Sequence, residues 1–110
     1  MKIVYNNIIP FKGFLAINLL GILFVRSKYK GRVSERVITH ETIHTKQMQE
    51  MLYVFFYLWY VVEWFIRLLF TWNPHRAYRS ISFEREAYLY EEFPNYPNER
   101  SYFNWIKLLF

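Results

Sequence analysis

Residues 33–72 read VSERVITHETIHTKQMQEMLYVFFYLWYVVEWFIRLLFTW, a stretch of forty residues without glycine or proline. The absence of both helix breakers predicts helix throughout this stretch. Ser34 followed by Glu35 suits a helix start, because a serine can cap the first turn and an acid is stabilised at the positive end of a helix. The stretch therefore predicts either one very long helix or two helices joined by a tight corner.

Within this stretch, His40, Glu41 and His44 form the pattern HExxH. Side chains four positions apart lie one above the other on one helix face, so two imidazoles can reach a single cation. The glutamate beside the first histidine can accept a proton from a metal-activated water and pass it to a leaving group. Two of only three histidines fall in this pattern. The alternative is a pair of exposed helical histidines that bind nothing.

The chain has no cysteine, so a tight transition-metal site must use histidine or carboxylate ligands. Such ligands suit Zn²⁺, although iron or manganese could occupy a similar shell. The later stretch SFEREAY offers Glu84 and Glu86, of which only one can face the metal, since helix residues two apart point to different sides. An unbroken helix would carry the chain roughly 40 Å from His44 to Trp72, and twelve residues could barely return that far. If Glu84 meets the histidines, the long stretch must bend, and we place the corner near residues 50–53.

These residues resemble the gluzincin metallopeptidases, which carry HExxH on one helix and a glutamate ligand on a later helix. In several branches the later helix reads Glu-x-x-Ala followed by Asp or Asn, and residues 84–87 match the first four positions. The resemblance implies that Glu84 is the third zinc ligand beside His40 and His44, and that Glu41 is the general base and acid. Tyr88 stands where the family has Asp or Asn, and Glu86 remains an alternative ligand.

The chain is also similar, over roughly residues 36–90, to short bacterial proteins, many of unknown function, that carry HExxHxxQ and a later F-E-x-E-A. Gln47 matches the glutamine and lies one turn past His44, where it could hydrogen-bond a ligand side chain. An ordinary solvated glutamine is an equal alternative. Gluzincins often stabilise the oxyanion with His or Tyr, for which the candidates are His75, Tyr78 and Tyr88, although each tyrosine also suits a core position.

The remaining segments predict a small sheet and further helices. Residues 3–26 favour a pair of strands or a hairpin over a short helix at 14–25. A strand within residues 15–25 could line a cleft and pair with an extended peptide. Asn73-Pro74 should end the long helical stretch. Ser80 or Ser82 can cap a third helix that runs to about Phe93, and Ser82 is the better fit. The tail 101–110 should pack back as a short apolar helix.

The apolar second half of the long stretch raises the question of a membrane. A spanning helix needs about 20 apolar residues, whereas Glu63 and Arg67 can form an ion pair within this one. Such a pair is costly inside a bilayer, so we favour a buried or membrane-surface helix over a span. The aromatic stripe at helical spacing favours core packing; it consists of Tyr53, Phe56, Tyr57, Tyr60 and Trp64.

With 110 residues, the chain predicts a single minimal metallopeptidase-like domain over residues 1–110. We expect an α+β fold in which an N-terminal β-hairpin or small sheet precedes a three- to four-helix bundle with the metal site. Its net charge of +5 is scattered and no recognition motif is present, so we expect no nucleic-acid partner. No signal peptide is apparent, which indicates a cytoplasmic or membrane-associated location.

The expected function is that of a zinc-dependent metallohydrolase, a peptidase that acts on a peptide or protein. The alternative is a membrane-associated helical protein in which the metal site is structural or incidental and no catalysis occurs. In either case a membrane surface is an expected partner.

Overall fold

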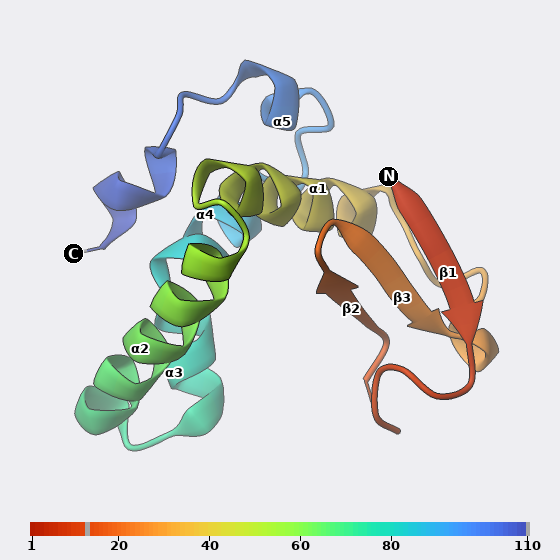
Figure 1. Cartoon of the computed structure of the whole chain (residues 1–110), viewed down its shortest axis with the longest axis horizontal. Coiled ribbons are helices and arrows are strands. Elements are labelled where there is room, and N and C mark those ends of the chain that lie inside the picture. The colour runs from red at the N-terminus through yellow and green to blue at the C-terminus, as the bar shows by residue number, and fades with distance from the viewer. Residues whose placement is uncertain (13, 110) are drawn as a thin grey trace.

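The computed structural model describes residues 1–12 and 14–109. The fold is α+β, as the sequence predicted: a three-stranded sheet precedes the helices and stands beside them (Figure 1). In chain order the described elements are β1 (Lys2–Asn6), β2 (Ala16–Leu19), β3 (Ile22–Arg26), the 3₁₀ turn η1 (Ser27–Tyr29), α1 (Glu35–Glu50), α2 (Val54–Thr71), α3 (Pro74–Ser80), α4 (Ser82–Tyr90), α5 (Tyr96–Glu99) and the 3₁₀ turn η2 (Asn104–Leu108).

The sheet has the strand order β1-β3-β2. β2 and β3 form an antiparallel hairpin, and β1 pairs with β3 in parallel. The hairpin turn consists of Leu20 and Gly21, both at positive φ (55° and 88°), which is the conformation that a two-residue type I′ turn requires. The strand prediction for this segment is confirmed, and the alternative of a helix at 14–25 is wrong. β2 is an edge strand, and no other described strand pairs with its outer edge.

The long helical stretch is divided by a tight corner at the position that the sequence predicted. α1 begins at its N-cap Ser34, whose hydroxyl accepts the backbone N–H of Val37 at 3.3 Å. It ends at Glu50, and Leu52 and Tyr53 both take positive φ (54° and 60°) before α2 starts. Each such residue costs on the order of 1 kcal/mol in backbone strain. The corner turns the chain so that α2 runs away from the end of α1 (Figure 1).

The connection to α4 differs from the prediction in two respects. The stretch after Pro74 is a short helix, α3, whose first backbone N–H groups are capped by the Asn73 side chain. Ser82 does not cap α4; the N-cap is Ile81. The reason is that the Ser82 hydroxyl and backbone N–H both donate to Glu63, at 2.6 and 2.7 Å. α4 also ends earlier than expected, at Tyr90.

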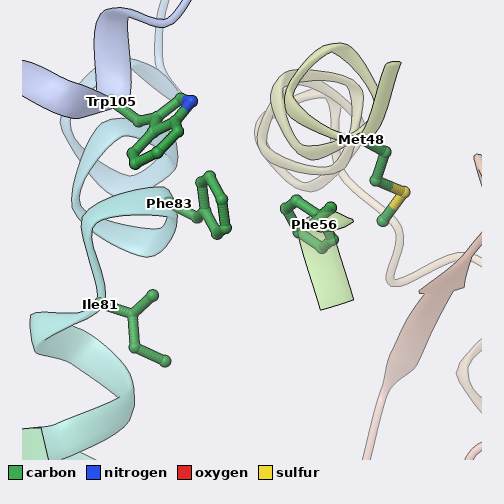
Figure 2. Close-up of a cluster of buried hydrophobic side chains, with 5 residues drawn as sticks. All are labelled: Met48, Phe56, Ile81, Phe83 and Trp105. Atoms are coloured by element: carbon green, nitrogen blue, oxygen red, sulfur yellow. The ribbon is translucent and has the colours of Figure 1, made fainter. Parts of the chain in front are cut away.

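The hydrophobic core lies where α1, α2, α4 and the C-terminal turn meet. In Figure 2 the Phe83 ring lies between Trp105 and Phe56, and the ring centroids are 4.6 and 4.5 Å away respectively. Met48 and Ile81 complete the buried cluster. The tail therefore returns to the core as predicted, but as a 3₁₀ turn that inserts Trp105.

Candidate metal centre

Three side chains that could ligate a metal meet between α1 and α4. The Nε2 atoms of His40 and His44 lie 3.1 Å apart, and Oε1 of Glu84 lies 3.2 and 3.0 Å from them. All three residues are buried. A tetrahedral Zn²⁺ ion with bonds of about 2.0–2.1 Å holds its ligand atoms roughly 3.3 Å apart. The donor atoms and their spacing therefore fit one such ion.

Local sequence explains why the two histidines face inward. The buried stripe of α1 has the three- and four-residue spacing of one helix face and consists of Thr39, His40, Ile43, His44, Gln47 and Met48. Two histidines and a glutamine thus occupy positions that an ordinary amphipathic helix would fill with aliphatic residues. Burying so many polar groups is costly unless each has a partner.

Gln47 fixes the orientation of His44. The Gln47 side-chain nitrogen donates to the Phe83 carbonyl at 3.0 Å and to Glu86 Oε1 at 2.9 Å. Its oxygen therefore faces His44 and accepts from Nδ1 at 2.8 Å. With Nδ1 protonated, Nε2 is the ring nitrogen left to bind a cation.

Glu84 is also held from outside the cluster. The Tyr60 hydroxyl donates to its second oxygen, Oε2, at 2.7 Å, and this bond leaves Oε1 directed at the histidines. Burial and the charge of Glu84 raise the pKa of Tyr60, so the phenol stays a donor at neutral pH. The pattern of α2 favoured core packing for Tyr60, and the contact with Glu84 was missed because no local signal distinguishes it.

The two candidates for the third ligand have different surroundings. Glu86 is fully buried but does not join the cluster. Its carboxylate accepts from the Arg100 guanidinium at 2.8 and 2.9 Å, from Tyr96 at 2.6 Å and from Gln47. Of the two open possibilities, the structure brings Glu84 to the histidines and directs Glu86 to Arg100.

Mutual electrostatics shifts the pKa values of the cluster. Burial alone would lower the pKa of His44, but the charge and hydrogen bond of Glu84 outweigh it and raise this pKa to about 9. Burial opposes ionisation of Glu84, yet the two imidazoles hold its pKa far below the ordinary value. Without a cation, the cluster therefore holds a proton at neutral pH that a metal ion would displace.

Glu41 lies at the edge of the cluster, with Oε2 4.0 Å from Nε2 of His40. Burial raises the pKa of Glu41, and the neighbouring imidazoles only partly offset this effect. The side chain lines a cavity that also exposes His44 and Glu84. Glu41 is thus beside the three candidate ligands, as its place in the pattern predicted.

The cavity is a cleft of about 970 Å³ between the sheet and the helices α2, α3 and α4. One wall is β2, and the other consists of aromatic side chains of α2 and α3. His75, Tyr78 and Tyr88, the three oxyanion candidates, all line it. In Figure 1 the sheet and the α2–α3 pair lie on the same side of α1, near its opposite ends.

Tyr88 occupies the position at which the gluzincins, which this sequence resembles, have Asp or Asn. Its ring packs edge-on against the His40 ring, with centroids 4.5 Å apart. Its hydroxyl is 2.7 Å from that of Tyr78, and the Arg79 guanidinium lies over its face at 3.7 Å. Tyr88 therefore restrains His40 by packing, while Glu91 Oε1 lies 3.8 Å from the other ring nitrogen of His40.

No family model, curated protein or solved structure matches this chain. The assignment of function therefore depends on the chemistry of the site itself.

Proposed function

We propose that this protein is a zinc-dependent hydrolase that cleaves peptides. The observation that carries the proposal is the convergence of His40, His44 and Glu84 on one point, with donor atoms 3.0 to 3.2 Å apart, beside a large cleft. Two imidazoles and one carboxylate leave a fourth position of a tetrahedral ion free, as catalytic zinc sites require. When bound, Zn²⁺ would polarise the scissile carbonyl and acidify water.

Glu41 serves as the general base. Its carboxylate accepts a proton from the attacking water and returns it to the leaving nitrogen. The raised pKa of Glu41 makes its carboxylate a stronger acceptor for the proton of water. A group that must both accept and donate a proton works best when its pKa lies near the operating pH, so a shift toward neutral suits this role. His75, Tyr78 and Tyr88 remain candidates for a hydrogen bond to the oxyanion, because all three face the cleft.

An extended peptide fits the wall formed by β2. The outer edge of this strand lacks a strand partner among the described residues, and added strands bind such edges through backbone hydrogen bonds. Asn18 fixes β2 to α1, because its side-chain nitrogen donates to the Glu41 carbonyl at 2.9 Å and to the Thr45 hydroxyl at 3.1 Å. The strand is thus tied to the same helical turn as the proposed base.

The lining of the cleft favours substrates with large apolar side chains. The surfaces opposite β2 include Met48, Phe56, Tyr57 and Trp64. Pockets of this kind select apolar side chains by contact, with polar groups setting orientation.

The test is hydrolysis of a fluorogenic peptide library by the zinc-loaded protein. Glu41→Gln should bind one zinc per chain and lose turnover by about 10²- to 10⁴-fold. The matched control is Glu35→Gln on the exposed start of the same helix, which should keep full activity. If wild type and Glu41→Gln cleave a substrate at the same rate, the proposed role of Glu41 is wrong.

A further inference from the structure

The outward half of α2 is wholly apolar. Ten residues of this helix are exposed, and none of them is polar or charged. At 100° per residue they cover about half of the helix circumference. We call them the apolar face of α2: Val54, Phe55, Leu58, Trp59, Val61, Val62, Phe65, Ile66, Leu69 and Phe70.

The exposed area of this face is larger than the largest apolar patch on a typical soluble monomer. Its side chains are between 41% and 81% exposed. With on the order of 200 Å² for a large side chain in full exposure, the face amounts to on the order of 1,000 Å². The largest apolar patch of a typical monomer measures about 300–600 Å².

The two charges of α2 are turned away from this face. Glu63 is 6% exposed and accepts hydrogen bonds from Ser82, from Trp59 and from Arg67. Arg67 also donates to the Leu109 carbonyl. Both ions are thus paired inside the protein, so an apolar phase could cover the outward half of the helix without desolvating a free charge.

The segment that contains the face has a net positive charge. Glu50, which lies beside Phe55 and Leu58, has a buried side chain that pairs with Arg100. Between residues 51 and 83, Glu63 is the sole acidic residue, and it is buried. The same segment holds exposed Arg76 and Arg79 on α3, which packs along α2. An anionic lipid surface complements this arrangement, whereas a second copy of the chain would present the same arginines and repel.

The position of those arginines also decides how the helix lies. At about 27 Å, α2 is nearly as long as the hydrocarbon layer is thick, about 30 Å. A span would surround α2 with lipid and carry α3, with Arg76 and Arg79, to the same depth. A helix in the plane of the interface buries one half alone and leaves the other half to the protein.

We propose that this protein binds the surface of an anionic lipid bilayer through the apolar face of α2, with the helix lying in the interface plane. The inference stands apart from the proposed hydrolysis and needs no metal. It gives the aromatic side chains of this face a role, because a tryptophan such as Trp59 favours the headgroup region.

Vesicle flotation of the full chain tests the affinity. Wild type should float with phosphatidylcholine vesicles that contain phosphatidylglycerol, and less with phosphatidylcholine alone or at high salt. Leu58→Glu, at a position 57% exposed on the apolar face, should weaken binding at least tenfold. The matched control is Leu89→Glu on α4, 55% exposed, which should bind as wild type does. Equal binding of all three proteins overturns the proposal, as does failure of wild type to float.

Depth measurement separates a flat helix from a span and from a dimer. The chain has no cysteine, so a single cysteine label can be placed at Phe55, Val62 or Leu69 along the face. With spin-labelled lipids as quenchers, all three labels should report the same shallow depth. A middle label much deeper than the outer two indicates a span and overturns the flat orientation. Labels that lipids do not quench, in a chain that sediments as a dimer, overturn membrane binding itself.

Discussion

Replacing Gln47 with methionine should weaken both the fold and the metal site. The substitution keeps the side-chain length but removes the hydrogen bonds to His44, Phe83 and Glu86. Glu86 keeps Arg100 and Tyr96 as donors, so two buried groups lose their only side-chain partner: the His44 Nδ1–H and the Phe83 carbonyl. At about 1–3 kcal/mol each, the free energy of unfolding should fall by about 2–6 kcal/mol.

The effect on zinc should be separable from the effect on stability. An imidazole that has lost its orienting acceptor typically binds metal about 10- to 100-fold more weakly. Competition with a chromophoric chelator measures this affinity, and chemical denaturation of the metal-free protein measures stability. Gln49→Met, on the exposed side of the same helix, should change neither. If Gln47→Met is destabilised yet binds zinc as wild type does, then Gln47 packs the core and does not orient His44.

Three further perturbations follow from the same contacts. Zinc affinity should rise about tenfold per pH unit between pH 6 and 8, because the pKa of His44 in the metal-free protein is raised to about 9 and zinc must displace that proton. Calorimetry in two buffers counts the protons that are released on binding. Zinc binding without proton release would refute this prediction. Tyr60→Phe should weaken zinc binding by roughly tenfold, since it removes the bond to the carboxylate ligand, whereas Tyr57→Phe loses bonds outside the cluster and should not. Glu86→Gln should lower the free energy of unfolding by about 3 kcal/mol, because it weakens the buried ion pair with Arg100. The variant should still bind one zinc ion per chain. Loss of zinc would instead indicate that Glu86 is a metal ligand.

Much of the fold was predictable because its signals are local. The absence of glycine and proline over 33–72 fixed the helical stretch, and the reach of the chain back to Glu84 required the corner that Leu52 and Tyr53 form. The strands were readable from short runs of Ile, Val, Leu and Phe that Pro10, Gly13 and Gly21 separate, although the hairpin turn lies at Leu20 and Gly21 and not near Pro10. The helices and strands depend on neighbours in sequence, so a sequence pattern can carry them, whereas the corner followed from the limited length of chain between the histidines and Glu84.

The parts that were missed depend on contacts between distant residues. Serine is a common helix cap, but the hydroxyl and the backbone N–H of Ser82 both donate hydrogen bonds to Glu63 on another helix. Tyr60 follows the same apolar periodicity as its core neighbours, and only the folded chain brings its hydroxyl to Glu84. Likewise, the sequence gives no sign that Arg100 reaches back to Glu86. The spacing of apolar residues predicts which side of a helix is buried, but it does not identify the polar residue of another element that a buried side chain will contact.

More of the candidate metal site than of its hydrogen-bond partners could be predicted, because the spacing of ligands along one helix is a local property. His40 and His44 share one helix face by their separation alone, and Glu41 follows from the same turn. The choice between Glu84 and Glu86 required the phase of α4, which its N-terminal contact with α2 determines.

The most direct test of the metal centre is zinc K-edge X-ray absorption of the full chain loaded with one equivalent of zinc. The structure predicts a four-coordinate ion with two imidazole nitrogens at about 2.0–2.1 Å and oxygen in the remaining positions, and Glu84→Ala should lose the bound ion or one oxygen ligand. A spectrum without imidazole scattering, or one that Glu84→Ala leaves unchanged, would contradict the proposal that these three residues share one ion.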